Sequence, residues 1–265
     1  MKKIVLLLVF ALSVSTTKAW VNVLDQSAMV LASQNLTPAA QERVKEILKG
    51  GELKDHTHYL IRVRKGGAAQ HTRGWNLLHL DSNLKPVRGI EKDALTQLEL
   101  AAETLRSYAT NSDSLNMASL ELILQLIPDM HTVSNVRIEG VPYSQKDFSW
   151  TLTYGKEGTK AEKRRTLKWN SFWQSRFVGF HSGFSPEFYA EDFGVAYGAK
   201  REEMQKGTPA DWAHDIGVAV RPLYDWAVQD YVMCNQQQLE LEDLFFTQVA
   251  KAGYRIAALL NEVLK

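Results

Sequence analysis

Two groups of side chains in this sequence have the chemistry of nucleic-acid recognition. A short basic run from Lys160 to Arg165 carries charges that can bind phosphates. Three tryptophans near it in the chain have ring faces on which bases can stack, namely Trp150, Trp169 and Trp173. Basic runs this short are more often solvated loops, and rings this large more often pack in a core. We therefore expect a loop and core positions, with nucleic-acid contact as the alternative.

Asp129 is a second candidate, because it is a carboxylate inside an apolar segment. The segment from Ser119 to Met130 predicts a buried helix, and a buried charge needs a partner. Gln125 lies four residues earlier, so both side chains face the same side of the helix. Asp129 is therefore either a metal ligand or a structural carboxylate bonded to the chain start and neighbouring amides. His131 has a different helical phase, so a ligand role for it is the less favoured reading.

The elements that position these residues are mostly helices. Thr37 is a good N-cap, Pro38 suits the first turn of a helix, and Gly50 ends it. Helical spacing also predicts a helix from Ala94 to Tyr108. Apolar residues of the last helix recur at steps of three and four: Leu241, Phe245, Val249, Ala252, Ile256, Leu259 and Val263.

One stretch departs from the helical pattern. Phe148, Trp150, Leu152 and Tyr154 alternate with polar residues, which predicts a strand. Gly155–Gly158 then predicts a turn. We expect a β-hairpin excursion from a helical body.

The chain begins with the pattern of a secretory signal peptide. Two lysines precede the apolar stretch from Ile4 to Leu12, and Thr17-Lys18-Ala19 is a small-residue cleavage signal. We expect residues 1–19 to be removed and the protein to be exported, to a periplasm or to the medium. A retained anchor helix is the alternative. No other stretch approaches the ~18 apolar residues of a membrane helix, so we expect no membrane insertion after processing.

Composition limits the function classes. Hydrophobic residues make up 45% and charged residues 23%, which is typical of a globular protein. The formal net charge of +1 gives no overall argument for a polyanionic partner. Cys234 is the single cysteine, so no internal disulfide stabilises an exported chain. We expect one domain over residues 20–265.

Four landmarks in order point to a known family. They are Trp20 after the cleavage signal, Leu126–Met130, Trp212-Ala213-His214-Asp215, and Val249–Ala257 with Leu260-Asn261-Glu262. Together they resemble the trinuclear-zinc family of single-strand-specific nucleases and 3′-nucleotidases over essentially the whole mature chain. That family shares its fold with bacterial zinc phospholipases C. The resemblance implies an all-α bundle of the phospholipase C/nuclease type, with the hairpin as an excursion.

The resemblance also implies a set of zinc ligands. Trp20 matches the N-terminal ligand residue, and Asp25 stands where the family has a histidine. His79 matches a later histidine, with Asn76 as the rival position. Asp129 is the ligand kept from the central motif. These four residues are the residual metal candidates.

The remaining ligand positions carry groups with little affinity for zinc. Neutral amides stand at Gln125, Asn135, Asn170 and Gln174, and the segment from His58 to Arg62 lacks the family's carboxylate. Amides keep hydrogen-bonding capacity but lose the donor strength of His and Asp. We therefore expect no zinc or one zinc, and not three.

Three histidines near the motifs have a simpler reading. His79 is more simply a hydrogen-bonded structural histidine than a ligand. His56 and His58 are off register with the motifs, and we expect them at the surface.

Three functional hypotheses follow. The leading one is an exported, non-catalytic family member that binds a nucleotide, single-stranded nucleic acid, another polar ligand or a protein in the former nuclease cleft. The alternative is an active phosphodiesterase or endonuclease with a rewired, reduced zinc site. The third is a structural or interaction protein without a ligand.

Overall fold

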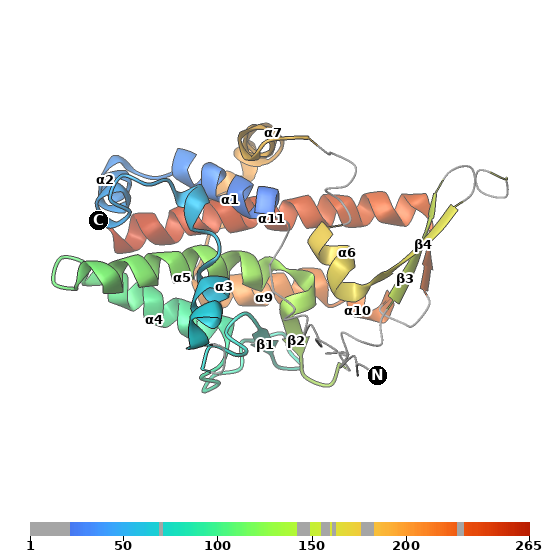
Figure 1. Ribbon diagram of the computed structural model, residues 1–265. Helices are drawn as coiled ribbons and strands as arrows, with labels where there is room; N and C mark the ends of the chain where they lie inside the picture. The colour runs from blue at the N-terminus through green and yellow to red at the C-terminus, as the bar shows by residue number, and fades with distance from the viewer. Residues whose placement is uncertain are drawn as a thin grey trace, which may run out of the picture.

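The computed structural model describes residues 22–68, 71–141, 149–154, 160, 163–175, 183–226 and 231–265. This part of the chain is mostly helical, which confirms the predicted class (Figure 1). The signal peptide with its cut before Trp20, and the turn at Gly155–Gly158, lie outside the described residues.

The elements have the following bounds. The α-helices are α1 (Asn22–Gln34), α2 (Pro38–Ile47), α3 (Tyr59–Val63), α4 (Ala94–Arg106), α5 (Asp113–His131), α6 (Trp169–Ser175), α7 (Pro186–Tyr197), α8 (Arg201–Gln205), α9 (Pro209–Val220), α10 (Leu223–Trp226) and α11 (Asn235–Val263). Short helical turns are η1 (Leu53–His56), η2 (Arg64–Ala68), η3 (Val133–Asn135) and η5 (Gly198–Lys200). The strands are β1 (Leu78–Leu80), β2 (Val136–Ile138), β3 (Ser149–Tyr154), β4 (Lys163–Lys168) and β5 (Tyr231–Met233).

Local sequence signals set several helix ends. The Thr37 hydroxyl accepts a hydrogen bond from the amide of Ala40 at 3.3 Å, with Pro38 at the first helical position. α2 ends before Lys49 and Gly50, whose φ angles are 51° and 88°. Glycine adopts this left-handed conformation without the steric cost of a side chain, so the predicted stop is confirmed.

Two long helices, α5 and α11, form the centre of the bundle. α4 packs against α5, and α1 packs against α11 (Figure 1). α7 lies against α1, and α9 contacts α4 and α5. Residues far apart in the sequence are thus brought to the two central helices.

The close approach of α1 and α11 depends on Gly253. A Cβ atom at this position would lie 2.9 Å from the carbonyl oxygen of Ala28 and 3.0 Å from the side chain of Leu31. Any side chain would therefore push the two helices apart. Near the end of α11, the Asn261 amide donates to the carbonyl of Asn35 at 3.0 Å and its oxygen accepts from the Thr37 amide at 2.7 Å.

The predicted hairpin is present and is part of a larger sheet. β3 and β4 pair antiparallel, with Trp150 opposite Leu167. β5, which the sequence did not predict, adds to β3 in parallel. Lys163, Arg164 and Arg165 lie in β4, so the prediction of a loop for the basic run was wrong there. Strand pairing with β3 fixes the backbone of these residues regardless of their charge.

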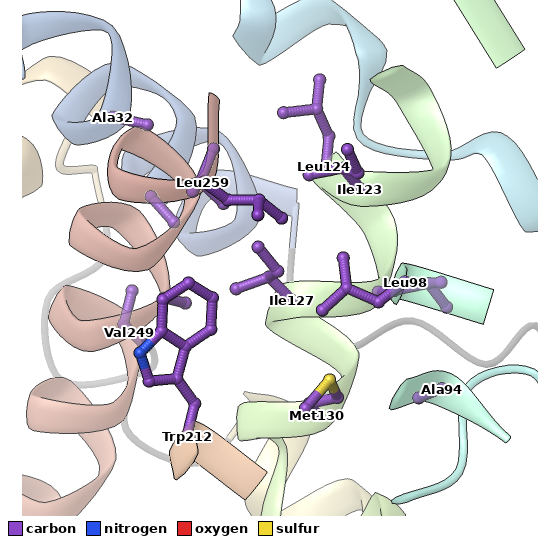
Figure 2. Packing of buried hydrophobic residues seen from close by; sticks show 14 of the residues in the cluster. Ala32, Ala94, Leu98, Ile123, Leu124, Ile127, Met130, Trp212, Val249 and Leu259 are labelled. Carbon is purple, nitrogen blue, oxygen red and sulfur yellow. The ribbon is translucent and has the colours of Figure 1, made fainter. Parts of the chain in front are cut away.

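The core is one cluster of buried hydrophobic residues that extends from Leu24 to Leu264. Figure 2 shows Ile127 and Met130 of α5 close to Leu98 of α4, with Trp212 of α9 near Val249 of α11. Trp169 and Trp173 are completely buried, which confirms their predicted core role. The side chain of Trp150 lies outside the described residues.

Among the helices of the described residues, none has the length and apolar character needed to cross a membrane.

Candidate functional site

A row of three polar side chains follows one side of α5. Glu121, Gln125 and Asp129 are spaced four residues apart, and we call them the α5 polar stripe. This spacing places them one above the other on the helix. Each is at least 96% buried. Burying three such groups is costly unless each has partners, so their contacts define the candidate site.

Asp129 receives hydrogen bonds from two amide side chains. Gln125 Nε2 donates to Asp129 Oδ2 at 3.0 Å. Asn135 Nδ2 donates to the Asp129 carbonyl at 3.0 Å and to Oδ1 at 3.4 Å. Asn135 reaches the carboxyl group because η3 turns the chain back directly after α5. Three of the residues singled out in the sequence therefore meet at one place.

Arg64, the first residue of η2, favours the ionised form of Asp129. Burial raises the pKa of Asp129 to about 8, although the Gln125 amide, the Arg64 guanidinium and the Asn135 amide act in the opposite direction. Arg64 is held by donating to the Thr72 carbonyl at 2.9 Å and to Asn76 Oδ1 at 3.3 Å. A fixed guanidinium thus supplies positive charge near the buried carboxyl group.

Glu121 has a different set of partners at the other end of the stripe. His56 Nδ1 lies 2.8 Å from Glu121 Oε1, and the Arg62 guanidinium pairs with Glu121 Oε2. The Arg62 guanidinium also lies 5.8 Å from the ring centroid of Tyr59. Two arginines, Arg62 at the end of α3 and Arg64 at the start of η2, therefore lie beside the α5 polar stripe.

A second buried network starts from His131 on another side of α5. His131 Nδ1 lies 2.8 Å from the Ile127 carbonyl, so this nitrogen carries the hydrogen. Arg255 donates to His131 Nε2 at 2.9 Å and to Asp215 Oδ2 at 2.5 Å. Lys251 also pairs with Asp215 at 2.8 Å. Both ring nitrogens of His131 are occupied, which excludes it as a replacement metal ligand in this arrangement.

Two of the other metal candidates, Asp25 and His79, lie in α1 and β1. Asp25 is buried in the first turn of α1, with 3% of its surface exposed. His79 is in β1, where its Nδ1 lies 2.9 Å from Asp93 Oδ2. The same oxygen accepts from the His79 backbone amide at 2.9 Å, and the other Asp93 oxygen caps α4. His79 is thus bonded to the start of α4, which supports its structural reading.

Other candidates fall outside what the structure describes. Trp20 precedes the described residues, and the side chains of Asn170 and Gln174 are not described, although both residues lie in α6. The backbone of α6 contacts η3, the turn that carries Asn135.

His56 and His58, which the sequence placed at the surface, are partly exposed and have hydrogen-bond partners. Both are half-buried. His56 pairs with Glu121, and His58 Nε2 lies 2.6 Å from Asn22 Oδ1. The partner of His56 is a buried carboxylate, whereas the partner of His58 is an exposed amide at the start of α1.

Sequence reasoning missed Arg64 and Glu121. Glu121 extends the spacing of Gln125 and Asp129 by one more step of four, so periodicity could have found it. Arg64 follows the segment that lacks the family's carboxylate. A buried carboxyl group requires polar partners, but no local pattern in the sequence indicates that Arg64 is one of them.

The described side chains around Asp129 are not those that zinc prefers. Zinc binds imidazole nitrogen, thiolate and carboxylate oxygen, but Gln125 and Asn135 direct amide N–H groups at Asp129. Within the described part of the chain, no three His, Cys, Asp or Glu side chains are grouped as metal ligands would be. The site is better matched to a hydrogen-bonded carboxyl group than to a metal centre.

In comparisons with known proteins, no protein-family model and no curated protein sequence matches the chain.

Proposed function

We propose that this chain is an exported, non-catalytic member of the zinc-dependent single-strand nuclease and 3′-nucleotidase family. Its function is to bind a nucleotide or a short single-stranded nucleic acid in the region of the former metal cleft. The observation that carries the proposal is the Asp129 carboxyl group, which takes hydrogen bonds from Gln125 and Asn135. These are the positions where the family resemblance implies a zinc ligand set.

The packing of two landmarks supports the family assignment. The Trp212–Asp215 landmark lies in α9, and the closing landmark lies in α11. Asp215 joins the two helices through Arg255 and Lys251. Segments singled out by the resemblance are therefore in direct contact in the fold.

The chemistry of the site supports a loss of catalysis. The family reaction needs a metal-activated water beside a phosphate that cations hold in place. Here the carboxyl group is fully buried and bonded to neutral amides, which leaves no room for a phosphate beside it. A ligand would contact the surface around the polar stripe and not Asp129 itself. Binding is the part of the family function that survives this change.

Elemental analysis of mature protein purified without chelator tests the loss of the metal site. We expect no zinc or one zinc per chain, and no cleavage of single-stranded DNA or of adenosine 3′-phosphate after zinc is added. Three bound zinc ions would overturn the proposal. Zinc-dependent cleavage that Asp129→Ala abolishes would establish the alternative, an active phosphodiesterase with a reduced site.

A restoration experiment tests the register of the resemblance. The variant with Gln125→His, Asn135→His, Asn170→His and Gln174→Asp should take up more zinc than the unmodified chain, because it regains strong donors. A control with the same classes of change at separated, exposed positions is Gln41→His, Asn83→His and Gln236→Asp. Equal zinc uptake by the two folded variants would show that the motifs are wrongly aligned.

A thermal-shift measurement tests the binding function separately. A ligand that binds only the folded state raises the melting temperature in proportion to its concentration relative to Kd. We expect adenosine 3′-phosphate or a single-stranded oligonucleotide to raise Tm. No shift at millimolar nucleotide, in a protein without zinc, would favour a structural or interaction protein without this ligand.

A further inference from the structure

An aromatic cavity of about 350 Å³ lies between α7 and α11, on residues that the polar stripe does not involve. Six aromatic side chains line it, namely Phe184, Phe188, Tyr189, Phe193, Tyr197 and Phe246. Its volume is in the range of cavities that hold small ligands. In Figure 1, α7 is seen nearly end-on above α11 at the edge of the bundle, and it contacts both α1 and α11.

The rings form a continuous wall. The centroids of Phe184 and Phe188 are 4.3 Å apart, and those of Tyr189 and Phe246 are 6.1 Å apart. Phe193 links both helices, because its centroid lies 5.9 Å from that of Phe246. Phe184 and Phe188 remain 41% and 48% exposed. Large aromatic surface left open to solvent beside a cavity marks a binding site more often than a structural one.

The charge around the wall is negative. Asp192 lines the cavity and is exposed. Burial raises the pKa of Tyr189 to about 12, and Glu242 and Asp192 act in the same direction. Burial also raises the pKa of Tyr197, with Asp243 and Asp192 acting the same way against a hydrogen bond from Thr247. Carboxylates from both helices therefore place a negative potential on the aromatic rings.

We propose that this cavity binds a small quaternary ammonium compound, with the cation against the aromatic wall and its charge balanced by Asp192. Aromatic faces attract cations, and recognition of quaternary ammonium by aromatic rings is a recurring use of this attraction. A quaternary ammonium has no N–H donors, so it loses no hydrogen bonds in a cavity lined mainly by carbon. This proposal does not depend on the family assignment or on the binding of nucleotides.

Calorimetric titration with choline, compared with its neutral isostere 3,3-dimethyl-1-butanol, tests the proposal on the full mature chain. The two compounds have the same shape, so the difference in their affinities measures the contribution of the charge. We expect choline to bind at least about tenfold more tightly than the alcohol, and less tightly as salt increases. Equal affinities would reduce the site to a plain apolar cavity, and no binding of either compound would also overturn the proposal.

Substitutions inside and outside the aromatic cavity test whether choline binds there. Phe188→Leu keeps an apolar group but removes a ring, and we expect it to weaken choline binding by about fivefold. Asp192→Asn should weaken it by about threefold and leave the affinity of the alcohol unchanged. Val195→Ala and Glu191→Gln are matched controls on exposed positions of α7 outside the cavity. If the controls weaken binding as much as the two test variants, choline binds elsewhere and the proposal is wrong.

The competing occupant is a second copy of this chain. Sedimentation velocity across a range of protein concentrations measures this possibility directly. We expect the sedimentation coefficient to be the same for the unmodified chain and for Phe188→Leu. A concentration-dependent dimer that Phe188→Leu disrupts would show that the aromatic wall is an association surface, which would overturn the proposal.

Discussion

Arg255 of α11 donates a hydrogen bond to Nε2 of His131 of α5 at 2.9 Å, although both side chains are at least 97% buried. A guanidinium has no acceptor atoms, so the imidazole must be neutral for this contact to form. Burial, and then the charge of Arg255, hold the pKa of His131 well below its usual value of 6.5. The two central helices are thus joined by a bond that protonation would break.

The contribution of His131 to stability should therefore be lost as the pH falls below about 6.5, whereas protonation of Asp129, whose pKa is raised, acts in the opposite direction. The unfolded chain takes up a proton on His131 in this range, whereas the folded chain does not, so protonation favours unfolding. In His131→Gln, which cannot titrate, the unfolding free energy at pH 5 relative to that at pH 7.5 should be higher than in the unmodified chain. Urea unfolding at several pH values measures this difference. His214→Gln, at an exposed position of α9, is the control and should keep the unmodified slope.

Removal of the buried guanidinium should be more harmful than removal of its neighbouring ammonium group. Arg255→Leu leaves the Met204 carbonyl and His131 without their donor and should destabilise the fold by about 3 kcal/mol. Lys251→Met should cost less, about 1 kcal/mol, because Asp215 keeps its bond to Arg255. Chemical denaturation compares the two variants. Equal losses of unfolding free energy would show that the bonds of Arg255 to the Met204 carbonyl and to His131 add little to its ion pair with Asp215.

Alanine at Gly253 should destabilise the protein in spite of its better helix propensity. The new Cβ would approach the Ala28 carbonyl to 2.9 Å, and we expect a net loss of about 2 kcal/mol. Gly194→Ala in α7 is the matched control, because a Cβ there meets nothing within 4 Å. That variant should gain up to about 1 kcal/mol. If both variants are stabilised, α1 and α11 are not in close contact at this position.

Arg64 and Asp129 should be energetically coupled. In a double-mutant cycle of Arg64→Met and Asp129→Asn at pH 9, we expect a coupling free energy of about 1 kcal/mol. That pH lies above the raised pKa of Asp129, which is about 8, so the carboxyl group is ionised. A cycle of Arg88→Met and Asp129→Asn is the control, because Arg88 pairs with Glu99 at 2.6 Å. Additive effects in both cycles would mean that Arg64 does not balance the charge of Asp129.

Local signals in the sequence determined where many elements begin and end. The cap and proline at Thr37 and Pro38, and the glycine at position 50, act within a few residues and hold in the structure. The apolar periodicity of the last segment predicted a helix, which is α11. The helix begins at Asn235, six residues before the first apolar residue of the pattern. The stretch before Leu241 is polar, so periodicity gives no sign of the early start.

The candidate site was only partly accessible to sequence reasoning. Gln125 and Asp129 share one side of a helix because of their spacing, and this follows from the sequence alone. Arg64 and Asp129 are 65 residues apart in the sequence, and no local pattern predicts that they lie near each other. The pairing of His79 with Asp93, and not with Asp129, likewise depends on how β1 is placed beside α4.

The sequence by itself determined the helical class, the first strand of the hairpin, and the placement of Gln125 and Asp129 on one side of a buried helix. Only the tertiary structure decided what those groups contact: the parallel pairing of β1 with β2, the third strand β5, the bond between His131 and Arg255, and the aromatic cavity between α7 and α11. The physical reason is the separation along the chain of the residues that interact. Capping and periodicity depend on interactions within one or two turns, whereas these contacts form only when distant segments pack and bury their side chains together.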